Sequence, residues 1–344
     1  MLASIFGLTG PVLTADERAF FAECDPAGYI LFGRNCETRT QLRALTDALR
    51  AIHGRAHLAI LIDQEGGRVA RMRPPEWPHF PSGEIFDQLY RQAPMTAMEA
   101  ARINAEALGA MLCEVGITVN CLPLLDVRTP LTHPAIGDRS LGADPIQVAS
   151  LGRAVLDGLA AGSVVGVVKH MPGQGRATVD SHLQLPVVSE ARATLVANDF
   201  LAFQRLNTAP MGMTGHIVFE AYDAGRPATL SPIVINDVIR GEIGFDGFLM
   251  SDDLDMKALD RSVAERAAGC VAAGCDVALN CWGRMDEMIA VANAVGELTA
   301  IGTDRLDRAM TSVSARSDRP NFADLIDRRD RLLQAGSSEP VHLV

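Results

Sequence analysis

Residues 164–182 read VVGVVKHMPGQGRATVDSH, an apolar run that ends abruptly in a charged, glycine-rich segment. The run at 164–168 predicts a buried β-strand, because short apolar stretches rich in β-branched residues are typical of strands buried on both faces. The segment that follows it contains Lys169, His170, Asp180 and His182. A surface loop has no packing reason to gather such residues, so we expect a functional site at the end of this strand.

The alternation of strand and helix patterns along the chain predicts the fold. Eight short apolar runs are strand candidates, at 4–8, 29–32, 58–62, 118–122, 164–168, 211–214, 248–251 and 276–280. Helical patterns separate most of them, for example at 38–53, 97–115, 145–161, 190–206 and 257–274. Strands that alternate with helices indicate a parallel sheet, and eight of them predict a TIM-like (β/α)8 barrel of the α/β class.

The domain organisation follows from where this alternation stops. No internal repeat and no linker rich in glycine, proline or serine interrupts it, so we expect one catalytic barrel over residues 1–302. Residues 303–344, which include the charged run 327–331, are predicted to form a helical extension that packs on the barrel and frays at its end.

The composition of the chain indicates which kind of ligand it binds and in which compartment it functions. The chain has a formal net charge of −11 and no long run of lysine or arginine, so we expect a small-molecule ligand rather than nucleic acid or an anionic membrane. Its seven cysteines are scattered without a C-x-x-C pair, which favours reduced thiols and a cytoplasmic location. Residues 1–14 make a poor signal peptide, and no apolar segment approaches the roughly 20 residues that span a bilayer.

Polar residues that directly follow predicted strands are the candidate site residues. They are Asp63, Gln64 and Glu65 after the third strand, Asp126 after the fourth, Lys169 and His170 after the fifth, His216 after the sixth, and Asp252 and Asp253 after the seventh. In a barrel the C-terminal ends of all strands meet at one mouth, where the active sites of this fold lie. An open doubly wound sheet would bring these five positions together less easily.

Asp252 is a candidate nucleophile. It closes the apolar run 248–251 and precedes a predicted helix, whose N-terminus would keep the carboxylate ionised. The alternative is that Asp252 or Asp253 only caps a helix at 254–256. Because the two aspartates are adjacent, one can be the nucleophile while the other caps the helix.

Asp180 and His182 are a candidate acid/base pair. Their i, i+2 spacing turns both side chains to the same side of an extended loop, where the carboxylate can orient the imidazole. The alternative is an ordinary surface or packed histidine. The glycine-rich approach at 172–175 favours function, because glycine lets the backbone come close to a ligand.

The stretch 63–71, DQEGGRVAR, places carboxylates, glycines and arginines beside a strand end. Such a mixed set of donors and acceptors suits the vicinal hydroxyls of a polyol or sugar. The alternative is a purely structural network of salt bridges among Asp63, Glu65, Arg68 and Arg71. The turn 137–140, GDRS, is similar in kind and a weaker signal.

Taken together, four segments resemble glycoside hydrolase family 3, and specifically its single-barrel β-N-acetylglucosaminidases of cell-wall recycling. They are 62–69 (IDQEGGRV), 137–140 (GDRS), 169–182 and 251–254 (SDDL), and they occur in the family's order. The long KH-x-P-G-x-G-x(4)-D-S-H stretch is highly specific. The resemblance implies a retaining hydrolase that releases terminal β-linked N-acetylglucosamine from cytoplasmic muropeptide fragments carrying 1,6-anhydro-N-acetylmuramic acid. We expect a monomer without cofactor or bound metal.

The resemblance also implies residue roles. Asp252 matches the nucleophile, and Asp180 with His182 matches the general acid/base. The positions that match sugar-binding residues are Asp63, Arg71, Arg139, Lys169 and His170. A neutral histidine base repels an anionic acceptor less than a glutamate would, so both water and phosphate stay open as acceptors.

The chain departs from the family pattern at two positions. Gln174 stands where the family usually has histidine, and Asp255 stands where serine is common. Neither position matches the nucleophile or the proton donor. Glutamine hydrogen-bonds but does not titrate, so we expect Gln174 to affect the stiffness or closure of the loop more than the chemistry.

Two other functions are compatible with a barrel. A metal-dependent amidohydrolase could use His170, His182, His216 and Asp252 as ligands. Such barrels usually carry an H-x-H pair after the first strand, where this chain has Gly-Leu-Thr at 7–9. A catalytically silent sugar-binding barrel is the third possibility.

Overall fold

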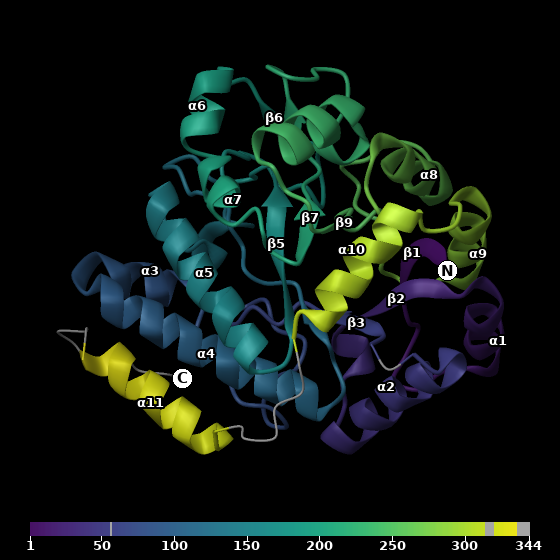
Figure 1. Ribbon diagram of the computed structural model, residues 1–344, viewed down its shortest axis with the longest axis horizontal. Coiled ribbons are helices and arrows are strands. Elements are labelled where there is room, and N and C mark those ends of the chain that lie inside the picture. The colour runs from purple at the N-terminus through teal and green to yellow at the C-terminus, as the bar shows by residue number, and fades with distance from the viewer. Residues whose placement is uncertain (56, 314–319, 336–344) are drawn as a thin grey trace.

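The computed structural model describes residues 1–55, 57–313 and 320–335. Eight parallel strands form one sheet in the order β10-β1-β2-β3-β4-β5-β7-β9. They are β1 (Leu2–Gly7), β2 (Pro26–Leu31), β3 (Ala59–Ile62), β4 (Val119–Asn120), β5 (Val165–Met171), β7 (Met211–Thr214), β9 (Phe248–Met250) and β10 (Ala278–Asn280). A parallel bridge between Met250 and Val277 brings the two ends of this sheet together. The predicted TIM-like (β/α)8 barrel is confirmed (Figure 1).

Helices surround these strands (Figure 1). The α-helices are α1 (Ala15–Cys24), α2 (Arg39–His53), α3 (Gly83–Gln92), α4 (Pro94–Glu114), α5 (Pro145–Ala161), α6 (Arg192–Ala197), α7 (Leu201–Arg205), α8 (Val263–Ala273), α9 (Met285–Ala294), α10 (Ala300–Thr311) and α11 (Phe322–Ala335). Shorter or irregular turns are the 3₁₀ helices η1 (Gly33–Asn35), η2 (Gly137–Arg139) and η3 (Ala228–Leu230) and the π-helix η4 (Val234–Glu242). A small separate sheet pairs β6 (Val187–Val188) with β8 (Val218–Phe219).

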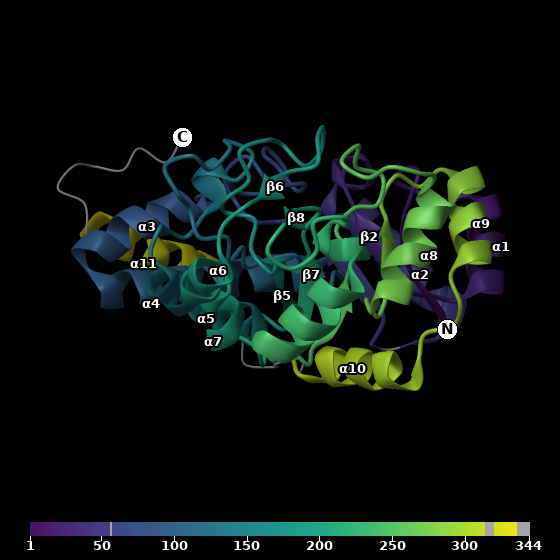
Figure 2. The ribbon, with the colours of Figure 1, turned by 90° about the horizontal axis from the view of Figure 1, so that it is seen from above.

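Two apolar layers hold the barrel together, because successive strand residues face opposite sides of a sheet. In β3, Leu61 belongs to the cluster that fills the barrel interior, whereas Ile60 and Ile62 pack in the layer between strands and helices. Leu306 and Met310 of α10 join the interior cluster. Helix α10 therefore closes one end of the barrel, the lower edge in Figure 2, and leaves the opposite end for the site.

The structure corrects two helix predictions. Residues 254–262 are not helical, and α8 begins only at Val263, where Ser262 and Glu265 form a capping box. Asp252 and Asp253 therefore cap no helix, and a helix N-terminus does not keep Asp252 ionised. The segment predicted as one helix at 190–206 is divided into α6 and α7, which are separated by residues 198–200.

The predicted boundary at residue 302 falls within α10. Farther along the chain, α11 packs against α4, where Arg329 Nη1 donates to Asn104 Oδ1 at 3.3 Å. The frayed end predicted for this extension, residues 336–344, lies outside the described residues. Within the described ranges, none of the helices has both the length and the apolar character needed to cross a membrane.

Candidate active site

A cavity of about 530 Å³ opens at the C-terminal ends of the strands. The eight residues to which the resemblance assigns catalytic or sugar-binding roles all line it: Asp63, Arg71, Arg139, Lys169, His170, Asp180, His182 and Asp252. Of the strand-end candidates, Gln64, Asp126 and His216 are not among its lining residues. Ile30, Met213 and Leu279 belong to the interior layer of the barrel and also line the cavity. The fold thus brings together site residues that lie at or after the ends of four strands, β3, β4, β5 and β9.

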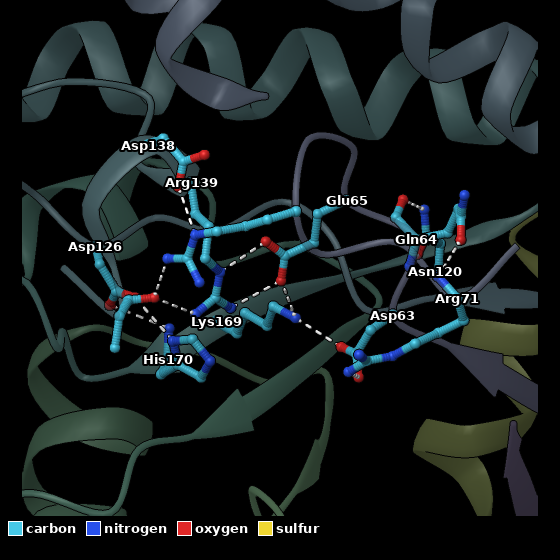
Figure 3. Close-up of polar contacts among 12 residues, drawn as sticks. Asp63, Gln64, Glu65, Arg71, Asn120, Asp126, Asp138, Arg139, Lys169 and His170 are labelled. Carbon is cyan, nitrogen blue, oxygen red and sulfur yellow. Dashed lines mark hydrogen bonds and ion pairs between the residues drawn. The ribbon is translucent and has the colours of Figure 1, made fainter. Parts of the chain in front are cut away.

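Lys169 is the centre of a charged array in this cavity (Figure 3). Its side chain is 2% exposed, and its Nζ lies 2.9 Å from Asp63 Oδ1 and 2.7 Å from Glu65 Oε1. Arg139 binds Glu65 through two parallel hydrogen bonds, Nε to Oε2 and Nη2 to Oε1, both at 2.8 Å. Arg71 Nη2 donates to Asp63 Oδ2 at 3.2 Å. Each carboxylate is therefore shared between Lys169 and one arginine.

The array remains charged at neutral pH. Burial opposes ionisation of Glu65, but the charges of Arg139 and Lys169 hold the pKa of this carboxyl well below its ordinary range. Burial likewise opposes the charge on Lys169, yet Asp63 and Glu65 hold its pKa above the ordinary value. The array contains one more cation than anions, and it offers a substrate both donors and acceptors in fixed positions.

The predicted salt-bridge network therefore exists with different members. Asp63, Glu65 and Arg71 belong to the array, whereas Arg68 pairs outside it with Asp138 at 2.8 Å. The sugar-binding interpretation and the salt-bridge interpretation of residues 63–71 concern the same side chains, because the ion-paired array also lines the cavity. The sequence placed Glu65 among the strand-end candidates, but the resemblance assigned it no sugar-binding role.

Gln64 shapes the turn that carries Asp63 and Arg71. It is buried, and its Oε1 accepts from the N–H groups of Arg71 at 2.8 Å and Met72 at 3.0 Å. Asn120 at the end of β4 accepts from Gln64 N at 3.0 Å and donates back to its carbonyl at 2.9 Å. These buried bonds fix the loop on neighbouring strands, as Figure 3 shows.

Asp126 orients His170. The carboxylate is fully buried, and its Oδ2 lies 2.7 Å from His170 Nδ1. Its Oδ1 accepts from His170 N at 3.2 Å and from Gln174 N at 2.7 Å. A carboxylate bonded to Nδ1 leaves Nε2 as the imidazole atom available to a ligand. The sequence placed Asp126 at a strand end but did not predict this function.

Asp252 follows β9 and is partly exposed in the cavity. Enclosure by protein would raise the pKa of its carboxyl, but the charges of His170 and His216, the Asp253 N–H and the charge of Lys169 together lower it. The hydrogen bond from Asp253 N to Asp252 Oδ1 is 2.8 Å long. Asp252 is therefore ionised at neutral pH, as a nucleophile must be.

Asp180 and His182 are in direct contact on the loop after β5. His182 Nδ1 lies 2.7 Å from Asp180 Oδ1, and His182 N donates to the same oxygen at 3.0 Å. The His182 side chain is 64% exposed, so Asp180 rather than packing sets the direction of the ring. Partial burial by itself would raise the pKa of the Asp180 carboxyl, but these bonds hold the pKa below its ordinary value. The pair is arranged as a carboxylate-oriented imidazole.

The ligand set of the metal alternative is not assembled. Across residues 1–55, 57–313 and 320–335, no group of three or more histidine, cysteine, aspartate or glutamate residues could hold a metal ion. His216 instead bonds to Thr229 Oγ1 at 2.8 Å and to the carbonyl of Asp253 at 2.9 Å.

This fold and site define a class, the (β/α)8 barrel enzymes whose active site lies at the strand ends. Residues 11–315 match the model of the glycosyl hydrolase family 3 N terminal domain. The chain belongs to glycosyl hydrolase family 3.

Relatives from several bacteria cover most of the chain. A beta-hexosaminidase of Alkalilimnicola ehrlichii is 36% identical over 281 residues, 80% of each chain. A beta-hexosaminidase of Aromatoleum aromaticum is 33% identical over 321 residues, which cover 92% of this chain and 87% of the relative.

Solved structures agree over the whole barrel. NagZ from Neisseria gonorrhoeae is 27% identical, with a TM-score of 0.84 and coverage of 97% of this chain and 98% of that one. The same protein in complex with N-trifluoroacetyl-D-glucosamine has a TM-score of 0.83 at 28% identity, with the same coverage of both chains.

Proposed function

We propose that this glycoside hydrolase is a retaining exo-glycosidase that releases terminal, non-reducing β-linked N-acetylglucosamine. The observation that carries the proposal is one cavity lined by an ionised carboxylate, Asp252, and by the carboxylate-oriented imidazole of His182. Relatives named beta-hexosaminidase and a structural neighbour that binds N-trifluoroacetyl-D-glucosamine support a 2-acylamino sugar as the substrate.

The charged array holds the terminal sugar. Asp63 accepts from its hydroxyl groups, and Arg71, Arg139 and Lys169 donate to them, while His170 presents Nε2. The array is already assembled through its own ion pairs, so little side-chain entropy is lost when the sugar binds.

In the first step, Asp252 attacks the anomeric carbon. The bond from the carboxylate oxygen to that carbon forms while the glycosidic carbon–oxygen bond breaks, and His182 Nε2–H protonates the departing oxygen. Asp180, 2.7 Å from Nδ1, stabilises the imidazolium that His182 needs to act as an acid.

In the second step, His182 acts as a base. Its neutral Nε2 takes a proton from water, the water oxygen bonds to the anomeric carbon, and the ester to Asp252 breaks. Two inversions at that carbon give net retention, and both catalytic groups return to their starting states. We take water to be the acceptor, with phosphate as the alternative that a histidine base leaves open.

The finer identity of the substrate belongs to the same proposal. The resemblance of residues 169–182 to cell-wall recycling enzymes supports muropeptide fragments with N-acetylglucosamine linked to 1,6-anhydro-N-acetylmuramic acid, cleaved in the cytoplasm by a monomer. Hydrolysis of that disaccharide should exceed hydrolysis of N,N′-diacetylchitobiose in kcat/KM. Equal values would remove the muropeptide assignment and leave the glycosidase intact.

The experiment compares the 4-nitrophenyl β-N-acetylglucosaminide with the corresponding β-glucoside. The parent protein should act on the N-acetyl substrate, with a first product of β configuration by NMR. Asp252→Asn should abolish turnover, and Asp260→Asn, at an exposed aspartate eight positions farther on, should not. No turnover by the parent would overturn the proposal and restore the silent sugar-binding barrel.

A further inference from the structure

The loop that carries Asp180 and His182 is tied to the barrel mainly at its base and its tip. At the base, His133 N donates to the carbonyl of Ala177 at 2.8 Å. At the tip, Lys257 N donates to the carbonyl of His182 at 3.2 Å. The His182 side chain itself is 64% exposed, so it gains little from packing. The position of the imidazole over the cavity therefore depends on a few hydrogen bonds.

One of these bonds joins two buried side chains. Gln174 is 5% exposed and Ser181 is 3% exposed, and Gln174 Nε2 donates to Ser181 Oγ at 2.9 Å. Ser181 lies between Asp180 and His182 in the chain, and both residues of the bond line the cavity. Gln174 Oε1 is buried without a hydrogen-bond partner among the described residues, so the bond to Ser181 is the one hydrogen bond of the amide there.

The backbone of Gln174 is anchored independently of its side chain. Gln174 N donates to Asp126 Oδ1, the carboxylate that also holds His170. The glutamine thus sits between two parts of the site: its backbone is fixed to the support of His170, and its side chain reaches the loop of His182.

We propose that Gln174 is a positioning residue that holds the Asp180–His182 loop over the cavity through Ser181. The inference rests on the proposed glycosidase function. The bond does not enter the chemistry, so its loss should lower the fraction of molecules in which His182 can reach the leaving oxygen. One buried hydrogen bond of ordinary net strength corresponds to a roughly three- to tenfold change in that fraction.

The test uses Gln174→Met, which keeps the volume but removes the amide, Ser181→Ala, and the double variant. For N,N′-diacetylchitobiose, whose alkoxide leaving group needs a proton, kcat/KM should fall roughly three- to tenfold in each single variant. The double variant should be no worse than either single variant, because the same bond is lost in all three.

A second substrate separates positioning from general damage. The 2,4-dinitrophenyl β-N-acetylglucosaminide leaves without a proton, so its kcat/KM should stay within about twofold of the parent value. Gln174→His, whose ring N–H can still donate to Ser181, should keep most of the chitobiose activity that Gln174→Met loses. Gln184→Met, the same change at an exposed position of this loop, is the matched control and should have no effect.

The proposal is overturned by three results: parent-like chitobiose rates in both single variants, equal losses on both substrates, or additive losses in the double variant. If Gln174→Met does not fold, Ser181→Ala carries the test alone. Amide hydrogen exchange at Leu183 and Gln184, which bond to the carbonyl of Asp180, should accelerate in both single variants. Because hydrogen exchange needs no turnover, it tests the Gln174–Ser181 bond even if the glycosidase assignment is wrong.

Discussion

Replacing Lys169 with methionine tests whether the charged array holds the site together. Methionine keeps an unbranched apolar stem of similar volume but removes the ammonium that lies 2.9 Å from Asp63 and 2.7 Å from Glu65. The chain provides its own control, because Lys169 and Lys257 are the only lysines in the sequence. The Lys257 side chain is exposed.

The size of the effect follows from the partners that remain. Breaking a buried ion pair on one side costs ~3–5 kcal/mol, because the other charge stays buried without its counterion. Here Asp63 keeps Arg71 at 3.2 Å and Glu65 keeps Arg139 at 2.8 Å. We therefore expect the lower end, about 3 kcal/mol, which is roughly a 150-fold change in the unfolding equilibrium.

Urea unfolding followed by circular dichroism measures this loss directly. Lys257→Met should remain within about 0.5 kcal/mol of the parent. Under the proposed function, KM for the nitrophenyl substrate should also rise in Lys169→Met, because a donor to the sugar is gone. A Lys169→Met protein within about 1 kcal/mol of the parent would refute the reasoning, since it would show that the two arginines alone satisfy both carboxylates.

Acid should weaken the fold through Glu65, whose pKa is held low by Arg139 and Lys169 against the effect of burial. The stabilisation that ionised Glu65 gives to the fold is present above about pH 4.3 and is lost as the pH falls through the folded-state pKa. Below about pH 4, the free energy of unfolding from urea titrations should therefore fall more steeply for the parent than for Glu65→Gln. Asp126→Asn should lower the unfolding free energy by about 2 kcal/mol, because an amide replaces a carboxylate that accepts three hydrogen bonds; a calorimetric change under about 0.5 kcal/mol would contradict this. His182→Asn should lower kcat/KM for a disaccharide by about 10²–10⁴ and affect a dinitrophenyl glycoside far less, whereas equal losses would exclude His182 as the acid.

The strands were predictable because their signal is local. Each apolar run lies between polar turn residues, and the predicted run 248–251 differs from β9 by one residue at its end. The helix predicted at 257–274 shows the limit of this reasoning, because it begins only at Val263. Leu254 and Ala258 are buried and lie four residues apart, a helical spacing, yet the segment is irregular. The capping box of Ser262 and Glu265 was the better start signal, since it satisfies backbone donors that an apolar pattern ignores.

The contact between Asp180 and His182 was also predictable, since two residues of spacing allow few geometries. The site residues whose contacts were not predicted had weaker signals in the sequence. Asp126 was visible only as a strand-end residue, and nothing in its neighbourhood indicated that it would accept from both His170 and Gln174. Cavity-lining His133 had no pattern at all, because it lies in a loop between elements.

The sequence by itself determined the barrel and the end of it that carries the site, because strand number, alternation and the polar residues after each strand are written into contiguous residues. Only the tertiary structure decided the partners: Lys169 between Asp63 and Glu65, Arg139 rather than Arg68 on Glu65, and Gln174 on Ser181. Such choices depend on distances of about 3 Å between loops far apart in the chain. Those distances are set by how the loops pack on the barrel, which no local pattern encodes.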